Sequence, residues 1–399
     1  MSEVFPRHFL WGAATSAHQV EGNNHNDWTE WEKLGLVKDQ EHSGLATDHW
    51  HRYKQDFALA KDLGHNTHRL SIEWSRIEPR PGEFSAEAIE HYRQVLMELH
   101  RLGLKPIVTL QHFTLPTWVA RQGGWLRRKT ADHFARYVLI VIKELGSLAQ
   151  YWITMNEPTI YTTMVYVEGY WPPQQKNLWS AWLAIRNLVT AHRLAYQVIH
   201  RHFPGHQVGA ANNITDFMAW RRHNVLDQAL RGFAHYWHNQ WWLDQTYLTQ
   251  DFIGLNFYFP HWLKFRLTTP IKVFAPHHPP RLPKNDLGWT IYPPSLGHVL
   301  DWLKHYQRPI IVTENGIADA SDHWRADFIR RHVSEIEQAR GRGVDVRGYI
   351  HWSLIDNFEW REGFGPRFGL VEIDYPTQKR TIRPSAYAFR EIIRQHQAP

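Results

Sequence analysis

The sequence contains no cysteine, and this absence removes disulfide bonds, thiolate nucleophiles and thiolate metal sites together. A small disulfide-linked scaffold and a zinc ribbon are therefore excluded. The most apolar stretch, around 137–142, is much shorter than the roughly 20 residues that a membrane-spanning helix requires. Residues 1–10 lack a basic segment followed by a long apolar segment, so we expect no signal peptide, no membrane contact and a cytoplasmic location.

Charge is also sparse and nearly balanced. The chain has 45 Lys plus Arg and 39 Asp plus Glu, a formal net charge of +6, and charged residues make up only 21% of its 399 residues. The longest basic run is Arg127 to Lys129, and scattered basic residues are typical of a solvated surface. A nucleic-acid partner is therefore the weaker alternative, and we expect none.

Aromatic residues are abundant instead, with 21 Trp, 16 Tyr and 19 Phe. Hydrophobic residues at 43% suffice for a large core, so the chain is predicted to be globular. Trp and Tyr combine an apolar face with a polar group, which suits either core packing or contact with a sugar ring. Composition alone leaves these two uses open.

Hydrophobic periodicity predicts eight strands that alternate with eight helices. The predicted strands lie around 9–13, 67–72, 106–110, 152–154, 207–211, 252–255, 309–312 and 347–352. The predicted helices lie around 48–63, 85–103, 130–145, 178–202, 226–242, 294–306, 322–340 and 385–395, with Ser85 as a cap. This alternation indicates an α/β fold, a single (β/α)8 TIM barrel over 1–399, with the proline-rich stretch 270–294 as a loop. A doubly wound open sheet competes, but no G-x-G-x-x-G follows the first strand.

In such barrels the chemistry lies at the carboxyl ends of the strands. Polar and aromatic side chains lie in, end or follow most of the predicted strands: Gln19, Arg69, His112, Asn156, Glu157, Tyr258, Glu314 and Trp352, with Glu359 and Trp360 in the last loop. Two carboxylates, several groups for hydroxyls and an indole face together fit a carbohydrate site. Glu157 or Glu314 alone would more often be a solvated or ion-paired residue, but both are predicted to lie on the same rim.

The chain resembles glycoside hydrolase family 1 from Phe9 to about Tyr387. The motifs are Phe9-Leu-Trp-Gly-Ala-Ala-Thr-Ser-Ala-His-Gln-Val-Glu-Gly22, Arg69-Leu-Ser-Ile-Glu-Trp-Ser-Arg-Ile77, Thr154-Met-Asn-Glu-Pro158, Asp251-Phe-Ile-Gly-Leu-Asn-Phe-Tyr258, Thr313-Glu-Asn-Gly316 and Trp352-Ser-Leu-Ile-Asp-Asn-Phe-Glu-Trp360. The resemblance implies a (β/α)8 barrel that removes non-reducing-end β-linked sugars with retention. It also implies that neither a metal nor an organic cofactor takes part.

The same resemblance assigns roles residue by residue. It makes Glu157 the acid/base and Glu314 the nucleophile, and it makes Arg69 and Tyr258 the residues that contact the nucleophile. It implies that Asn156 binds the 2-hydroxyl and that Trp352 stacks on the sugar. It also implies that the groups around the 3-, 4- and 6-hydroxyls are Gln19, His112, Glu359 and Trp360. A retaining enzyme needs its two carboxyl groups about 5 to 5.5 Å apart.

The resemblance favours a β-glucosidase acting on small β-glycosides or oligosaccharides, with galactosides and fucosides left open. An anionic Glu359 would repel a 6-phosphorylated sugar. Phe113 stands where the family commonly has Trp, and the loop 168–177 also departs from the usual version. These departures concern the aglycone side, for which Tyr166, Tyr170, Trp171 and Trp324 are the candidate contacts.

Two further alternatives are weaker. A non-catalytic sugar-binding barrel would be expected to have lost one carboxylate, whereas both are present. The pairs His65 with His68 and His235 with His238 have ligand-like spacing, but no His-Glu-x-x-His occurs, so no metal site is predicted. The oligomeric state is left open.

Overall fold

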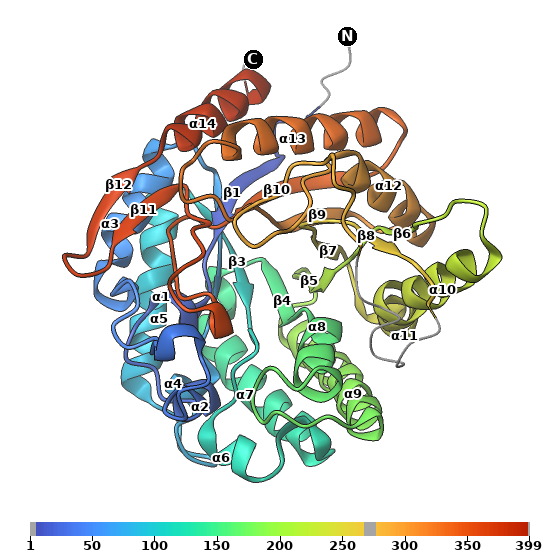
Figure 1. Cartoon of the computed structure of the whole chain (residues 1–399). Coiled ribbons are helices and arrows are strands. Elements are labelled where there is room, and N and C mark those ends of the chain that lie inside the picture. The colour runs from blue at the N-terminus through green and yellow to red at the C-terminus, as the bar shows by residue number, and fades with distance from the viewer. Residues whose placement is uncertain (1–4, 267–276, 398–399) are drawn as a thin grey trace.

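The computed structural model describes residues 5–266 and 277–397, and it contains a closed barrel of eight parallel strands (Figure 1). Around the barrel these are β1 (Leu10–Ala14), β2 (Thr67–Ser71), β3 (Lys105–Thr109), β4 (Tyr151–Asn156), β5 (Gln207–Asn213), β7 (Ile253–Asn256), β9 (Ile310–Asn315) and β10 (Val346–Trp352). β1 pairs in parallel with both β2 and β10, which closes the ring. The predicted (β/α)8 barrel is confirmed.

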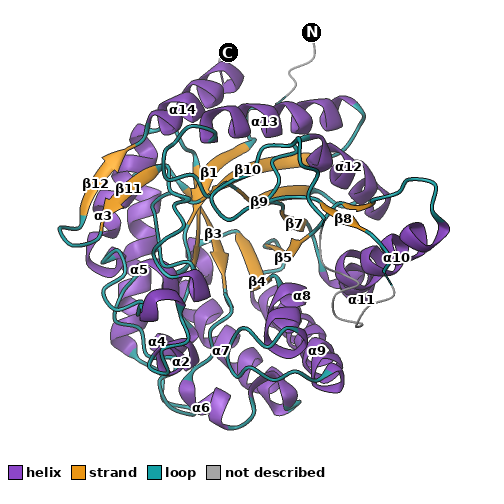
Figure 2. Ribbon diagram, viewed as in Figure 1, coloured by secondary structure: helices purple, strands orange, loops and turns teal. Residues whose placement is uncertain are grey.

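The larger helices surround this barrel, as Figure 2 shows. They are α3 (His49–Asp62), α5 (Ala86–Arg101), α7 (Lys129–Leu145), α9 (Leu178–His202), α12 (Pro294–Leu303), α13 (Arg325–Gly341) and α14 (Pro384–Gln397). The Ser85 side chain accepts a hydrogen bond from the amide of Ala88, as predicted for a cap. Residues 226–242 are helical throughout, as predicted, but a π-helical turn, η5 (Tyr236–Gln240), divides them into α10 (Val225–His235) and α11 (Trp241–Thr246).

Short elements fill the connections between barrel strands and helices. The α-helical ones are α1 (Ala17–Val20), α2 (Asp27–Glu32), α4 (Trp74–Ile77), α6 (Thr117–Arg121) and α8 (Pro158–Thr162). A second π-helical turn is η4 (Thr163–Val167), and the 3-10 turns are η1 (Lys38–Gln40), η2 (Gly124–Leu126), η3 (Gly146–Leu148), η6 (Tyr247–Thr249), η8 (Lys304–Tyr306) and η9 (Trp360–Glu362).

Two small sheets in these connections were not predicted. β6 (Phe217–Ala219) pairs in parallel with β8 (His261–Leu263), and β11 (Val371–Asp374) forms an antiparallel hairpin with β12 (Lys379–Ile382). The predicted proline-rich loop 270–294 lies partly outside the described residues. Its described part, 277–293, contains no helix or strand, only isolated bridges from His277 to Trp262 and from Lys284 to Thr290.

The apolar core has two layers. Barrel-strand residues such as Val108 and Trp152 pack in the larger cluster together with helix residues. A second cluster contains Leu10, Ile107, Ile311 and other residues, none of them helical, and therefore fills the barrel interior. This burial of both strand faces explains why the strands are near-continuous apolar runs in the sequence. Among the residues described, no helix is long and apolar enough to cross a bilayer.

Candidate active site

The carboxyl ends of the barrel strands surround a cavity of about 1440 Å³. Nine of the ten predicted site residues line this cavity: Gln19, His112, Asn156, Glu157, Tyr258, Glu314, Trp352, Glu359 and Trp360. The tenth, Arg69, is 1% exposed and lies behind the cavity wall. They come from the first, third, fourth, sixth, seventh and eighth strands of the barrel or from the segments that follow those strands. The structure thus brings together residues that are far apart in the sequence.

Glu314, near the end of β9, is held at both carboxylate oxygens. Arg69 donates from Nη1 to Oε1 at 2.5 Å, and Tyr258 donates its hydroxyl proton to Oε2 at 2.5 Å. The guanidinium is itself fixed, because Nη1 also donates to the carbonyl of Thr313 and Nε donates to Thr109 Oγ1, each at 3.1 Å. A cation and a hydroxyl donor therefore fix the orientation of the Glu314 carboxyl group.

Glu157 has a different environment. It directly follows β4, with a left-handed backbone (φ 43°), and it is 7% exposed. Its Oε1 accepts hydrogen bonds from Asn256 at 2.8 Å and from Asn213 at 3.1 Å. Burial, and next the negative charge of Glu314, raise the pKa of Glu157 to about 7, although the two amides act in the opposite direction. Glu157 can therefore carry a proton near neutral pH, as a carboxyl group that acts as an acid must.

Asn156 is connected to both carboxyl groups through shared hydrogen-bond partners, Arg69 for Glu314 and Asn256 for Glu157. Its Oδ1 accepts from Arg69 Nη2 at 2.7 Å and from Asn256 Nδ2 at 3.1 Å. Its Nδ2 lies 3.1 Å from Nε2 of His112. Burial, followed by the charge of Arg69, holds the pKa of His112 well below its ordinary value, so the ring is neutral and Nε2 can accept this bond.

A second group of polar residues in the site centres on Gln19. Its Nε2 donates to Asn357 at 2.8 Å and to Glu359 at 3.3 Å, and its Oε1 accepts from Ser16 at 2.6 Å. Burial, and then the charges of Glu314 and Glu157, raise the pKa of Glu359 to about 8. The raised pKa weakens, near neutral pH, the repulsion on which the predicted discrimination against 6-phosphorylated sugars rests.

Two indoles complete the site. The ring of Trp352 is stacked on that of His112 with centroids 5.9 Å apart, and the ring of Trp360 is stacked with those of His112 at 6.1 Å and His18 at 5.4 Å. Trp352 and Trp360 are 3% and 5% exposed, so packing fixes both rings at the cavity wall. A planar apolar surface of this kind suits the face of a pyranose ring.

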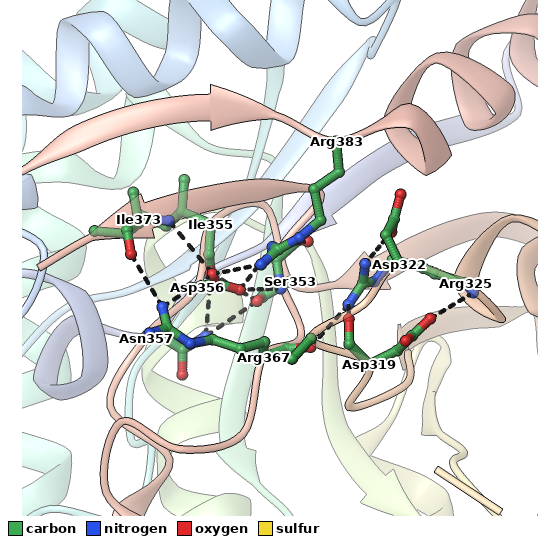
Figure 3. Close-up of polar contacts among 12 residues, drawn as sticks. Asp319, Asp322, Arg325, Ser353, Ile355, Asp356, Asn357, Arg367, Ile373 and Arg383 are labelled. Carbon is green, nitrogen blue, oxygen red and sulfur yellow. Dashed lines mark hydrogen bonds and ion pairs between the residues drawn. The ribbon is translucent and has the colours of Figure 1, made fainter. Parts of the chain in front are cut away.

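A buried ion-pair network supports the segment that follows β10 (Figure 3). Asp356 is fully buried and accepts from Arg383 at 2.9 Å on each oxygen and from Arg367 at 3.2 Å. The next residue, Asn357, donates to Ser353 Oγ at 3.0 Å and accepts the bond from Gln19. The network therefore positions Gln19 without contacting the cavity.

The family model described as Glycosyl hydrolase family 1 matches residues 1–250 and 247–398. The chain belongs to this family. It is 31% identical to beta-glucosidase A of Thermotoga maritima, with 98% of each chain covered, and 29% identical to the beta-galactosidase of Pyrococcus woesei, with 98% and 97% covered. Among solved structures, the beta-glycosidase from Pyrococcus horikoshii matches with a TM-score of 0.91 and 37% identity, over 100% of this chain and 99% of that one.

On the aglycone side of this family 1 site, the candidates divide into two pairs. Tyr170 and Trp171 line the cavity. Tyr166 and Trp324 are not among the lining residues, since Tyr166 is 1% exposed within the core and Trp324 is exposed at the start of α13. Nor do the described residues contain a group of three or more metal-binding side chains.

Three asparagines with clear positions in the site had no predicted role. Asn256 lies inside the quoted motif 251–258, where its spacing after a strand could have identified it. Asn213 lies two residues past the predicted end of its strand, and β5 extends to include it. Asn357 lies in the motif 352–360, but only the fold shows that it bonds Gln19.

Proposed function

We propose that this chain is a retaining β-glycosidase that removes a non-reducing-end β-linked sugar by double displacement. The observation that carries the proposal is the contrast between the two carboxyl groups. Glu314 is held by Arg69 and Tyr258, whereas the buried Glu157 has a pKa raised to about 7. One group is suited to attack and the other to give a proton.

In the first step, Glu314 attacks the anomeric carbon while the bond to the leaving oxygen breaks, and Glu157 gives its proton to that oxygen. The product is a glycosyl ester on Glu314 and a free aglycone. Esterification removes the charge of Glu314, which is one cause of the raised pKa of Glu157. Glu157 then loses its proton more readily and can take one from the water that attacks the anomeric carbon.

The sugar-binding roles follow from the same arrangement. Asn156 shares Arg69 with Glu314 and Asn256 with Glu157, which supports a contact with the 2-hydroxyl, where a hydrogen bond that strengthens in the oxocarbenium-like transition state raises the rate. Gln19, His112, Glu359 and Trp360 would surround the remaining hydroxyls, and Trp352 would stack on the ring. Glucose is the proposed sugar. Galactosides and fucosides stay as alternatives, because Gln19 and Glu359 can form hydrogen bonds with the hydroxyl groups of these sugars as well.

Activity on p-nitrophenyl β-glycosides tests the proposal. We expect Glu314→Ala to abolish hydrolysis and Glu157→Ala to reduce kcat by about 10²- to 10⁴-fold, the usual contribution of a general acid or base, because hydrolysis of the glycosyl ester loses its base. The first-formed product should be the β-anomer by NMR. Wild-type rates in both variants, or an α-anomer as the first product, would refute the assignment. The panel of sugars also shows which glycoside is preferred.

We further propose that 1–399 forms one catalytic domain that works without a metal or cofactor, in the cytoplasm. Every step above uses only side chains of this chain. Dialysis against a chelator should therefore leave kcat unchanged, and cell fractionation tests the location.

A further inference from the structure

Two positions at which the sequence departs from the family pattern, Phe113 and the loop 168–177, are in contact in the structure. The ring of Trp171, in that loop, packs on the ring of Phe113 with centroids 4.8 Å apart. Both side chains line the cavity. The two departures are far apart in the sequence, so only the fold shows that they concern one place in the site.

The neighbours of Trp171 belong to the sugar-binding side of the cavity. The centroid of its ring lies 5.9 Å from that of Trp360 and 5.5 Å from that of Trp28. Phe113 directly follows His112, and the centroids of these two rings are 5.1 Å apart. His112 and Trp360 are among the residues that the proposed function places around the sugar hydroxyls. Trp171 therefore adjoins the sugar-binding residues, although it was predicted as an aglycone contact.

The indole N–H of Trp171 is an unused donor. None of the residues that the structure describes accepts a hydrogen bond from it. The indole nitrogens of Trp31, Trp125 and Trp242 also lack an acceptor, but protein encloses them, whereas the nitrogen of Trp171 is not enclosed. Trp171 is 7% exposed and lines the cavity, so a bound molecule can reach this nitrogen. Because an indole N–H in a largely buried position usually has a partner, a hydroxyl group of the substrate is the missing acceptor.

The backbone around Trp171 is held in place before any substrate binds. The amides of Tyr170 and Trp171 both donate to the carbonyl of Met164, at 2.8 and 3.3 Å, and the amide of Gln174 donates to the carbonyl of Trp171 at 2.7 Å. Met164 lies in the π-helical turn η4, directly after α8. The position of the indole therefore needs little further ordering when a sugar binds, which favours binding.

We propose that Trp171 donates its indole N–H to the 3-hydroxyl of the sugar, and that Phe113 leaves the room that this indole needs. The proposal rests on the proposed function, in which Asn156 contacts the 2-hydroxyl. Asn156 donates to His112 at 3.1 Å, so His112 adjoins the next hydroxyl of the ring. Trp171 packs on the residue that follows His112. A Trp at position 113 would need the space that Trp171 occupies, so the two positions supply one indole between them.

The first test compares p-nitrophenyl β-glucoside with its 3-deoxy and 6-deoxy analogues. Trp171→Phe keeps an aromatic ring and removes the donor, so we expect kcat/KM for the glucoside and for the 6-deoxy analogue to fall about 5- to 30-fold. For the 3-deoxy analogue, which lacks the acceptor, kcat/KM should change by less than about twofold. An equal fall on all three substrates would mean that the indole only packs the cavity wall, and would overturn the inference. A wild-type protein that hydrolyses none of them would overturn the proposed function as well.

Trp182→Phe is the matched control. Trp182 also lines the cavity, but its ring packs on Trp237 and Trp241 and not on the sugar-binding residues. The ratio of kcat/KM between the glucoside and its 3-deoxy analogue should stay at the wild-type value in this variant. A fall of that ratio equal to the fall in Trp171→Phe would contradict a specific role for Trp171.

A reciprocal exchange tests the pairing of the two positions. Phe113→Trp alone puts two indoles where an indole and a phenyl ring now pack, so we expect a lower melting temperature. The double variant Phe113→Trp/Trp171→Phe again has one indole and one phenyl ring. We expect its kcat/KM for the glucoside to return to within about threefold of wild type, together with the preference over the 3-deoxy analogue. A double variant no more active than Trp171→Phe would contradict the pairing.

Discussion

At the scale of single residues, the nucleophile candidate depends on two donors that differ in kind. Arg69 is a buried cation fixed by four acceptors on three strands, and Tyr258 supplies one hydroxyl. Tyr258→Phe should therefore remove one charge-assisted hydrogen bond and leave the guanidinium in place. Such bonds contribute about 1.5 to 3 kcal/mol, so we expect kcat to fall about 10- to 100-fold.

The measurement is steady-state kinetics on an aryl β-glucoside, with near-UV circular dichroism to confirm packing. The phenyl ring of the variant should keep the edge contact that Tyr258 makes with Trp289, centroids 5.7 Å apart, so a structural change would not explain the loss. A kcat within twofold of wild type would show that the hydroxyl of Tyr258 does not support Glu314.

The acid/base candidate gives a prediction on pH dependence. Glu157 must be protonated to act as acid, and its pKa is raised to about 7, so kcat/KM should fall tenfold per pH unit well above pH 7. The bond from Asn213 lowers this pKa, so Asn213→Ala should raise it and move the basic limb to higher pH. Asn187→Ala is the control, because Asn187 donates a 2.8 Å bond to the carbonyl of Trp125, outside the cavity. A basic limb at the same pH in both variants would contradict the assignment of Glu157.

These residues also show what the sequence could reveal of the site. Each of the ten predicted residues lies in a strand or in the segment that follows one, and the barrel brings strand ends together, so their grouping was predictable. The supports were harder to predict. Asn256 in β7 bonds Asn156 and Glu157 at the end of β4, across the intervening β5, and Thr313 in turn donates to Asn256 at 2.7 Å. Such cross-strand pairs depend on barrel register, which hydrophobic periodicity does not specify.

At the scale of secondary-structure elements, segments buried on both faces were predicted well, and short connections were not. The eight barrel strands were found because burial makes them compact apolar runs. β11 also had a signal, since Val371 and Ile373 are buried and alternate with exposed Glu372 and Asp374. β6 and β8 have only three residues each, too few for a period of two to be detected. The π-helical turn η5 interrupts a continuous apolar pattern that predicts one helix.

The segment after β10 provides the prediction at this scale. Asp356 neutralises Arg383 and Arg367 in the interior, and the loss of its charge would leave a buried guanidinium unpaired. Asp356→Asn should lower the free energy of unfolding by about 3 kcal/mol, at the lower end of the range for broken buried pairs. It should also raise KM, because Asn357 and Gln19 would lose their fixed position.

The control is Asp345→Asn, which breaks the exposed ion pair with Arg347. These side chains are 50% and 47% exposed, so the change in unfolding free energy should stay within about 0.5 kcal/mol. Thermal unfolding of both variants measures the difference. Equal stability of the two variants would show that the buried network does not stabilise this segment.

At the scale of the whole molecule, the barrel closes by pairing its first strand with its last. β1 lies between β2 and β10, and both ends of the described chain meet beside it. The ring of His396 in α14 packs on Phe5 and Trp11, with centroids 4.6 and 5.9 Å apart. Residues from the two ends of the chain therefore lie in contact. The barrel should close in the same way if these ends are joined and the chain is interrupted at another connection.

This closure predicts that the order of the chain can be changed. One circular permutant joins the original ends through a short Gly/Ser linker and begins a new chain between Pro204 and Gly205. We expect it to fold and to keep kcat/KM within about threefold of wild type. Connections at the amino ends of the strands stabilise the barrel, whereas those at the carboxyl ends carry the site. Both residues are exposed, a Cβ on Gly205 would meet nothing within 4 Å, and this turn precedes β5, at the barrel end opposite the cavity.

The counterpart opens the chain between Asp356 and Asn357, beside the cavity. Its barrel strands are unchanged, but the bond from Gln19 to Asn357 and the ion pairs of Asp356 are no longer in one continuous segment. We expect a loss of at least about 100-fold in kcat/KM, because a small misplacement of the groups that hold the sugar is costly. Circular dichroism and aryl glucoside kinetics compare the two permutants. Equal activity of the two permutants would show that segment 353–357 can be cut and still position Gln19. If the first permutant were folded but inactive, the end of the barrel opposite the cavity would also control the chemistry.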